Sequence, residues 1–269
     1  MASLSNAFSN LTSTPRMPAL FVGHGSPMNA ILDNEYSRSW RKIGESLPTP
    51  KAILCVSAHW MTRGTTLVHI GRNPKTIHDF GGFPPELFAQ QYNAPGAPDF
   101  AQATIELLAD SHADGDDRWG LDHGAWSVLI QMFPKADIPV FQLSLDLSRG
   151  LADHFKLAAE LRALREKGVL IIGSGNIVHN LRALNFDGQV FDWAVEFDRY
   201  MADAIEARDV GKVLDAGSLG RAAALSHPTV EHFLPLLYPL AVMDKSDDLA
   251  FFNDTIDLGS ISMRSFVLS

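Results

Sequence analysis

Three histidines each follow a short apolar segment of the chain, and this placement could bring their imidazoles together. His24 follows the segment ALFVG, His59 follows ILCVSA, and His179 follows LIIGSGNIV. Apolar segments of this length, rich in β-branched residues, are typical of buried strands. Where such strands lie parallel in one sheet, ligands bind beyond the carboxyl ends of the strands. Three imidazoles at that edge could bind a metal ion or transfer protons.

Two further segments carry histidines in suggestive positions. The sequence DHGAW places His123 near the start of an amphipathic helix expected over Trp126–Phe133. A helix N-terminus favours the neutral imidazole, which can hydrogen-bond to a substrate oxygen, and the alternative is a capping or packing role. The sequence SHPTVEHFLPL predicts another helix that begins near Pro228. Adjacent residues on a helix point about 100° apart, so Glu231 and His232 would not both bind one ion. The residues this segment offers are His227, Glu231 and His232.

These segments do not match other common motifs. A single histidine is more often structural than catalytic, so each segment taken alone is weak evidence. The Gly173–Gly175 turn is not followed by the Lys of a phosphate-binding P-loop, and its spacing is not that of a dinucleotide motif. The Gly23–Ser26 turn lacks the Gly-x-Ser-x-Gly pattern of a nucleophile elbow. Three histidines in the same context favour a functional interpretation.

The elements that must position these histidines alternate along the chain between short apolar runs and longer amphipathic ones. This alternation predicts an α/β fold, a single domain with a central, mostly parallel or mixed sheet flanked by helices. The expected strands are Ala19–Val22, Ala52–Val56, Thr66–Ile70, Pro139–Leu145, Val169–Ile172 and Ile261–Leu268. The expected helices besides those above are Ser37–Leu47, Asp99–Asp110, Leu151–Lys167 and Phe191–Ala207.

Composition excludes several classes of function. The 269 residues are 46% hydrophobic, which is enough apolar material for a sizeable core. Lys and Arg number 22 against 31 Asp and Glu, and a net charge of −9 argues against nucleic acid as a partner. The single cysteine, Cys55, excludes a disulfide framework, a multi-cysteine zinc site and an iron–sulfur cluster. We expect Cys55 to be buried and inert, and any metal to be held by nitrogen and oxygen.

The first residues of the chain and its hydropathy indicate where in the cell the protein is expected. Residues 1–16 are rich in Ser, Thr and Asn and lack the apolar stretch of a secretory signal. We expect a flexible leader over residues 1–16 and a single catalytic domain over residues 17–269. No window approaches 18 consecutive apolar residues, so we expect no membrane-spanning helix and a cytoplasmic protein.

Six segments taken together resemble one family. They are PALFVGHGSP, SAHWMTR, TIHDFGGFP, LDHGAW, GSGNIVHNL and HPTVEHFLPLL, and they run in the family's order from about residue 17 to the C-terminus. The chain resembles the class III extradiol ring-cleavage dioxygenases of the LigB-type superfamily, in the 4,5-DOPA extradiol dioxygenase-like branch. Six ordered matches over most of the chain are far more specific than any one short motif.

The resemblance implies a mononuclear non-haem metal site. His24 and His59 match metal ligands of the family, and His232 matches the third ligand of this branch. The third ligand is a glutamate in the wider superfamily, so Glu231 remains the alternative. Two histidines and a carboxylate suit Fe(II), whereas three histidines bind Zn(II) as readily. We therefore expect Fe(II) to support turnover and Zn(II) to be able to occupy the purified protein.

The resemblance also implies roles for the other histidines. His179 matches the proposed acid/base of the family, and it could also bind the metal when substrate is absent. His123 matches a second active-site histidine that contacts substrate or oxygen. The implied partners are O₂ and a DOPA-like catechol, whose ring would open outside the diol.

The TIHDFGGFP segment is expected to line the pocket. His78 and Asp79 would contact the substrate, and Phe80 and Phe83 could stack on a catechol ring. The alternative is that Asp79 caps a turn and that the aromatic side chains belong to the core. The histidines without supporting context, expected to be structural or on the surface, are His69, His112 and His154.

One function is favoured, and two alternatives stay open. The first is metal-dependent extradiol cleavage of a catechol with O₂. The second is a zinc-dependent hydrolase, in which the same histidine cluster would activate water. The third is a non-catalytic family member that keeps the fold for binding. The sequence does not decide the oligomeric state.

Overall fold

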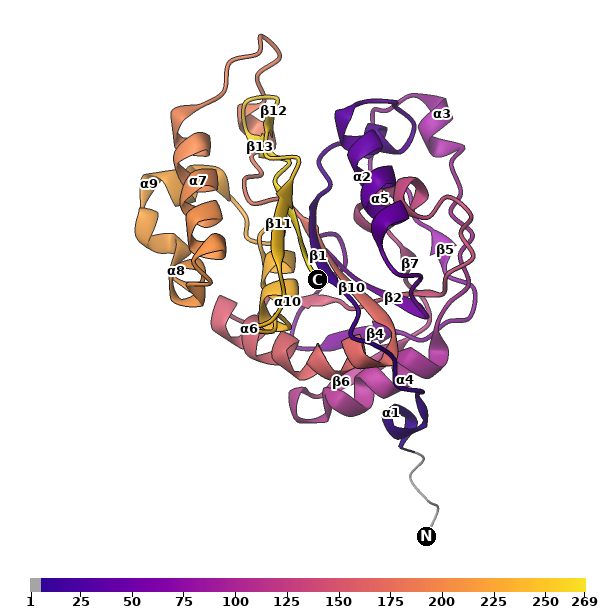
Figure 1. The fold of residues 1–269 in the computed structure, drawn as a ribbon. Helices are drawn as coiled ribbons and strands as arrows, with labels where there is room; N and C mark the ends of the chain where they lie inside the picture. The colour runs from indigo at the N-terminus through magenta and orange to yellow at the C-terminus, as the bar shows by residue number, and fades with distance from the viewer. Residues whose placement is uncertain (1–5) are drawn as a thin grey trace.

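The computed structural model of the protein describes residues 6–269 and is built around one six-stranded mixed sheet (Figure 1). The strand order is β11-β14-β1-β10-β2-β8. Strands β1, β10, β2 and β8 are parallel, β14 pairs antiparallel with β1, and β11 pairs antiparallel with β14 at the edge of the sheet. This confirms the predicted α/β class. The strands are β1 (Ala19–Gly23), β2 (Ala52–Ser57), β8 (Val140–Gln142), β10 (Val169–Gly175), β11 (Leu249–Phe252) and β14 (Ser265–Leu268).

Short strand pairs surround the main sheet. They are β3 (Met61–Thr62) with β9 (Leu145–Asp146), β4 (Thr66–His69) with β6 (Ala113–Asp116), β5 (Lys75–Thr76) with β7 (Gly120–Leu121), and β12 (Ile256–Asp257) with β13 (Ile261–Ser262). The first three pairs are parallel, whereas β12 and β13 are antiparallel.

Helices cover both faces of the sheet, as Figure 1 shows. Helices α2 (Glu35–Ser46) and α5 (His123–Met132) pack together on one face, and α6 (Leu151–Glu160) and α10 (Leu237–Ala241) pack together on the other. The remaining α-helices are α1 (Ala7–Asn10), α3 (Pro85–Phe88), α4 (Pro98–Leu107), α7 (Asp192–Glu206), α8 (Val210–Leu214) and α9 (Arg221–Ser226).

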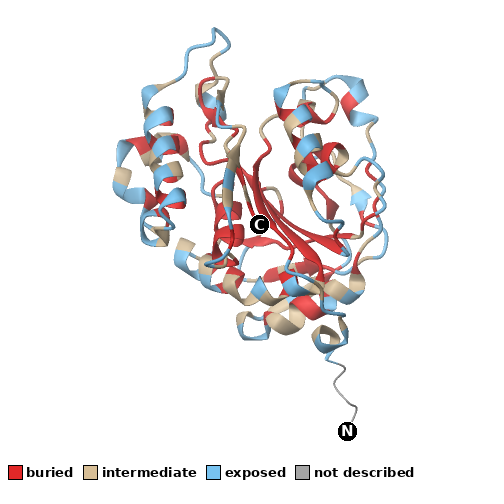
Figure 2. Ribbon diagram, in the orientation of Figure 1, coloured by how far each residue is buried: buried red, intermediate tan, exposed pale blue. Residues whose placement is uncertain are grey.

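The central strands are buried on both faces, which explains why they are continuous apolar runs (Figure 2). Alternate side chains point to opposite faces. On β1, Phe21 packs in the cluster that includes Leu157 of α6, whereas Leu20 packs in the cluster that includes Trp126 of α5. Cys55 is buried mid-strand as expected, and burial raises the pKa of its thiol well above the usual range.

Three predicted elements are divided in the structure. The expected strand Pro139–Leu145 becomes β8 and β9, because Ser144 turns away to bond Leu67 in place of continuing along β2. The expected helix Leu151–Lys167 is α-helical only as far as Glu160 and then continues as a 3₁₀ helix, Leu161–Lys167. The expected strand Ile261–Leu268 is β13 and β14, separated at Met263, whose N–H donates to the Thr255 carbonyl.

The helix predicted to begin near Pro228 is wrong. Residues 228–233 form turns, and helical structure starts only with a 3₁₀ turn at Leu234–Leu236 that leads into α10. The reason is a tertiary contact, since the His232 carbonyl accepts a hydrogen bond of 2.8 Å from the N–H of Asn176, just past β10. A carbonyl used in this way is not available to the i+4 N–H of a helix.

In the segment expected to be a leader, residues 1–5 lie outside the described part of the chain. Within residues 6–16, helix α1 places the N–H groups of Ala7 and Phe8 against the Glu106 carboxylate of α4, at 2.9 and 3.1 Å. The Phe8 side chain packs against the main core. Among residues 6–269, no helix is both long enough and apolar enough to cross a membrane.

Candidate metal centre

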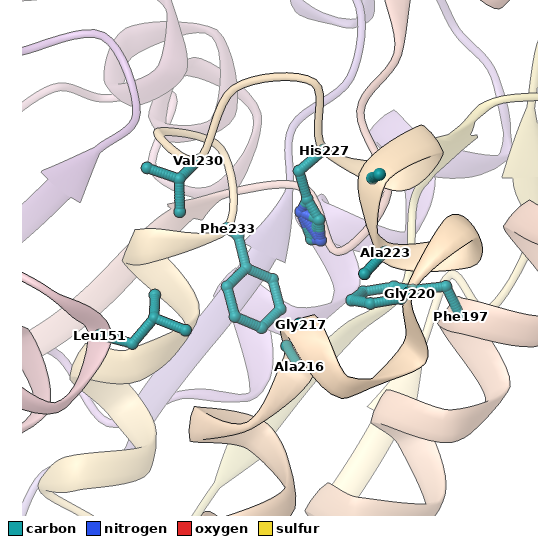
Figure 3. Close-up of a pocket in the computed structure, with 10 residues that line it drawn as sticks. Leu151, Phe197, Ala216, Gly217, Gly220, Ala223, His227, Val230 and Phe233 are labelled. Carbon is teal, nitrogen blue, oxygen red and sulfur yellow. The ribbon is translucent and has the colours of Figure 1, made fainter.

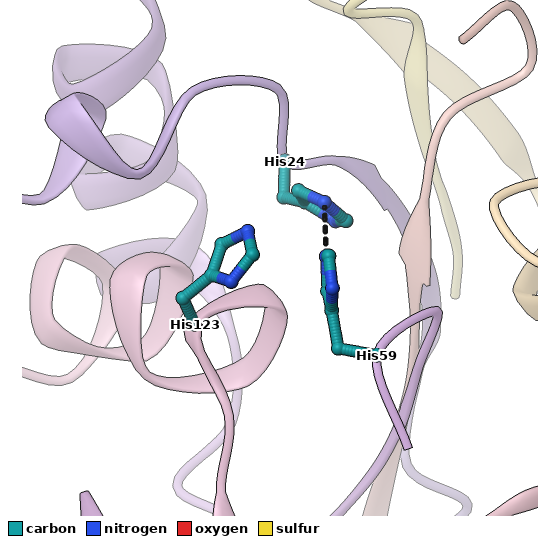
Figure 4. Close-up of side chains that lie close together, drawn as sticks. All are labelled: His24, His59 and His123. Carbon is teal, nitrogen blue, oxygen red and sulfur yellow. Dashed lines mark hydrogen bonds between the residues drawn. The ribbon is translucent and has the colours of Figure 1, made fainter. Parts of the chain in front are cut away.

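The carboxyl ends of β1 and β2 bring two of the predicted histidines into contact. His24 follows β1 directly and is buried, and His59 lies two residues beyond the end of β2. Their Nε2 atoms are 3.2 Å apart (Figure 4). The Gly23 position next to them must be glycine, because a Cβ there would lie 2.8 Å from the backbone of Met263.

Helix α5 delivers His123 to the same place. Asp122 begins this helix, since its carboxylate accepts a hydrogen bond of 3.2 Å from the Ala125 N–H. The Ser57 hydroxyl at the end of β2 donates to the same carboxylate at 2.5 Å. His123 therefore occupies the first position of a helix tied to β2, and its ring centre lies 3.8 Å from that of His59 (Figure 4).

The proton on the His24 ring is fixed by Ser174 of β10. The Ser174 hydroxyl donates to the Gly124 carbonyl at 2.5 Å, so at its 3.1 Å contact with His24 Nδ1 it can only accept. His24 must then carry its proton on Nδ1. Its Nε2 is left with a lone pair that faces His59.

The Asp79 carboxylate contacts the rings of both His59 and His123. Its Oδ2 lies 3.3 Å from Nδ1 of His59, and its Oδ1 lies 3.0 Å from Nδ1 of His123. The same Oδ1 accepts a hydrogen bond of 2.9 Å from the backbone N–H of His123. Burial alone would raise the pKa of Asp79, but the contacts with His123 and His59 outweigh burial and lower it. Asp79 is therefore a carboxylate, and its Oδ2 beside Nδ1 of His59 favours the tautomer with the proton on Nδ1, which leaves His59 Nε2 with a lone pair.

This donor set fits a metal cation. Two Nε2 lone pairs at 3.2 Å repel each other unless a positive charge lies between them. Two nitrogens that each bind one ion at about 2.0–2.1 Å in tetrahedral geometry lie about 3.4 Å apart, close to the observed separation. Ring nitrogens of His24, His59 and His123 all lie within 4.8 Å of one another. Ligating histidines commonly donate their other N–H to a carboxylate or another acceptor, and here Nδ1 of His24 faces the Ser174 hydroxyl and Nδ1 of His59 faces the Asp79 carboxylate.

His232 and His179 complete a cluster of five imidazoles. The ring centre of His232 lies 5.3 Å from that of His24 and 5.0 Å from that of His59. His179 stacks on His232, with ring centres 3.4 Å apart and planes 6° from parallel. Behind His232, the Glu231 carboxylate lies 3.4 Å from Nδ1. Glu231 thus takes the same place behind His232 that Asp79 takes behind His59.

Burial and mutual proximity lower the pKa of four of these rings, those of His24, His59, His179 and His232. Burial lowers the pKa of His59 to about 4 and that of His179 to about 4, and neighbouring histidines add to the effect. The pKa values of His24 and His232 are lowered well below the usual value for the same reasons. Neutral imidazole is the form that binds a metal or accepts a proton.

The five histidines open onto one cavity of about 590 Å³. Its walls are mainly apolar, which suits an aromatic ring. His78 does not line this cavity: its Nε2 lies 3.0 Å from the Gln90 carbonyl, and its ring packs beside Phe80 and Trp126. The apolar and aromatic side chains of the wall are Pro27, Phe80, Phe83, Leu181, Leu184, Phe186, Leu258 and Ile261.

His227 lines a separate cavity of about 340 Å³ (Figure 3). Its ring lies edge-on between Phe197 and Phe233, with ring centres 4.6 Å away on each side. Its Nε2 is buried and has no hydrogen-bond partner among the described residues. The side chain of His227 therefore does not line the cavity onto which the five clustered histidines open.

Sequence reasoning missed the groups that orient the histidines. The sequence presents Ser174 only as part of a glycine-rich turn, and Glu231 only as an alternative ligand. His154, expected to be structural, is buried between the Tyr238 hydroxyl and the Asp146 carbonyl, each 3.1 Å away. The available signal for Ser174 was its place at the end of a buried strand, next to a glycine on each side.

Comparison with known proteins decides the family. Residues 12–257 match the catalytic LigB subunit of aromatic ring-opening dioxygenase. The chain belongs to this family. It is 46% identical over 264 residues to the 4,5-DOPA dioxygenase extradiol of Escherichia coli (strain K12), covering 95% of this chain and 96% of the relative. It is 38% identical over 255 residues to the protein of the same name from Beta vulgaris, covering 91% and 94%.

A solved structure has the same fold. An uncharacterized Escherichia coli K12 protein has a TM-score of 0.81 with this LigB-family chain, at 41% sequence identity, over 94% of this chain and 100% of the other. These findings confirm the predicted extradiol branch of the aromatic ring-opening dioxygenases. Together with the histidine cluster, they indicate a metal cofactor.

Proposed function

We propose that this protein opens the ring of a DOPA-like catechol with O₂, outside the two hydroxyl-bearing carbons, at a single metal ion held by His24, His59 and His232. The observation that carries the proposal is the pair of Nε2 lone pairs that face each other at 3.2 Å, each fixed by a partner behind its ring. Bound Fe(II) supplies the redox chemistry by which a catechol reacts with O₂, and Zn(II) does not.

The choice of His232 as third ligand rests on its surroundings. Its Nδ1 faces the Glu231 carboxylate, which leaves Nε2 free to bind a metal, as in His24 and His59. His123 is the competing third ligand, because it is the histidine whose ring nitrogen groups with those of His24 and His59 within 4.8 Å among the described residues. We assign His123 to hydrogen bonding with the reacting oxygens, from the start of α5.

His179 is the proposed acid/base. Its ring is half-buried in the cavity wall, and because desolvation lowers its pKa to about 4, it is neutral at pH 7. It can therefore accept the proton of a catechol hydroxyl and later return it to an oxygen of the opening ring. Phe80, Phe83 and Ile261 provide apolar walls that hold the ring and exclude water.

The test is anaerobic loading with Fe(II), followed by oxygen uptake with 4-methylcatechol and L-DOPA. We expect one O₂ consumed per catechol and a yellow semialdehyde product, with no uptake by the zinc-loaded protein. His179→Gln should keep its metal content and lose at least about 100-fold in kcat, the contribution typical of a general acid/base. Absence of oxygen uptake with every catechol would refute ring cleavage, and full activity of His179→Gln would refute the assigned base.

A further inference from the structure

The wall of the cavity beside the five histidines contains acidic side chains but no Lys or Arg among the described residues. Besides the five histidines, the charged side chains that line it are Asp79 and Asp257. Asp79 is already committed to His59 and His123. A carboxylate-bearing substrate would therefore find no cationic partner in the wall, whereas Asp257 remains available to one of opposite charge.

Asp257 has no counter-ion of its own. It forms no ion pair within 4 Å among residues 6–269 and accepts no hydrogen bond from another side chain there. The charged group that acts on its pKa is another acid, Glu35. Burial raises the pKa of Asp257, and Glu35 adds to this. A cation beside Asp257 would favour its carboxylate form, which burial and Glu35 disfavour.

The position of Asp257 suits the far end of a substrate. It lies on β12, directly opposite Ile261 of β13, and Ile261 in turn pairs with His179. Residues opposite each other in antiparallel pairs are about 5 Å apart and point to the same side, so Asp257 lies two such steps, about 10 Å, from His179 along the backbone. All three side chains line the same cavity. A catechol at the histidines would extend a short side arm toward Asp257.

We propose that Asp257 is a specificity-determining residue that selects catechols with a positively charged amine on a short arm opposite the diol. This inference rests on the proposed function, because it takes the histidine cluster as the place where the diol binds. The amine pairs with the Asp257 carboxylate at the cavity wall. A carboxylate on the same arm gains nothing there and is directed toward solvent.

The experiment compares catechols that differ in the charge of the arm. The series is dopamine (cationic), 4-methylcatechol (neutral), L-DOPA (both charges) and 3-(3,4-dihydroxyphenyl)propanoate (anionic). With the iron-loaded enzyme we expect KM for dopamine to be about threefold to tenfold lower than for 4-methylcatechol, the range between an exposed and a partly buried ion pair. The propanoate should have the highest KM. Equilibrium binding of the same compounds to the zinc-loaded protein should give the same order without turnover.

Two variants isolate the carboxylate. Asp257→Asn should bring the dopamine to 4-methylcatechol ratio close to one, and Asp257→Glu should restore the preference. Asp254→Asn is the matched control, because this exposed acid lies three residues earlier and does not line the cavity. It removes the same charge from the same segment, and we expect it to keep the wild-type ratio.

The outcomes separate the two proposals. If none of the four catechols is consumed, ring cleavage fails, while binding to the zinc-loaded protein still shows whether Asp257 selects the amine. If 4-methylcatechol is consumed but dopamine shows no advantage, the role of Asp257 is refuted and ring cleavage stands. A preference that survives in Asp257→Asn, or that disappears equally in Asp254→Asn, also overturns the assignment.

Discussion

Replacing Asp79 by Asn tests how the histidines are held. The variant keeps the size of the side chain but replaces one carboxylate oxygen by an NH₂ group. That oxygen now lies 3.3 Å from Nδ1 of His59 or 3.0 Å from Nδ1 of His123. Since Nδ1 of His59 is a donor in our assignment, an amide NH₂ at this point would place two donors face to face. The His59 ring would lose its orientation or change its tautomer.

The loss of metal affinity expected for Asp79→Asn depends on which histidines bind the metal. Loss of a partner behind one metal-bound histidine costs about 10–100-fold in metal affinity, or about 1.4–2.7 kcal/mol. With His24, His59 and His232 as ligands, Asp79 supports only one of them, and we expect about a tenfold loss. With His123 in place of His232, Asp79 would support two ligands, and the loss would reach about 100-fold or more.

The assay is a Zn(II) titration of the metal-free variant in competition with a chromophoric chelator at neutral pH. Asp117→Asn is the control, since it removes an exposed acid that lies outside the cavity wall. Urea unfolding of the metal-free proteins shows whether the fold itself has changed. Zinc affinity within twofold of the wild type, in a folded Asp79→Asn protein, would refute the argument that this carboxylate orients a ligand.

Three further predictions concern other contacts. Glu231→Gln should weaken zinc binding about tenfold in the same titration, because it removes the charge behind Nδ1 of His232. Gly173→Ala should destabilise the fold by about 3 kcal/mol or more in urea unfolding, since its Cβ would lie 2.1 Å from a backbone carbonyl. Asp247→Asn should cost about 3–5 kcal/mol at pH 7, because Arg165 would be left buried without its ion pair. Burial raises the pKa of Asp247, but the bonds to Arg165 outweigh burial, so the pKa of Asp247 lies below its ordinary value of 3.8. The stability contributed by this ion pair is therefore present above pH 3.8 and is lost as the pH falls through the pKa of Asp247 in the folded protein.

Each of these has a contradicting result. Unchanged zinc affinity in Glu231→Gln would argue against His232 as a ligand. Gly217→Ala is the control for Gly173→Ala, because a Cβ at Gly217 meets nothing within 4 Å, and equal stability of the two variants would refute the packing argument. For Asp247, the gap in unfolding free energy between wild type and variant should narrow from pH 7 to pH 3, and a constant gap would exclude the ion pair as its cause.

Local sequence patterns were sufficient to predict the central sheet. Strands buried on both faces must be apolar throughout, and the runs that became β1, β2 and β10 are recognisable for that reason. Glycine and small residues at their ends marked the sharp turns after which His24 and His59 follow. The prediction failed near Pro228, where proline suggested a helix start but a carbonyl bonded to Asn176 holds the chain in turns. Such a contact joins residues far apart in sequence and leaves no local signal.

The sequence by itself therefore determined the fold class, the family and the set of histidines that could act, because strand ends and ordered motifs are local properties. Only the tertiary structure decided which groups stand behind those histidines. Asp79, expected to contact substrate, proved to lie against His59 and His123, and Ser174 fixes the proton of His24. The structure also separated His227 from the cluster, although it is only five residues from His232. Proton positions and ligand orientation arise from contacts between distant segments, and these exist only once the chain has folded.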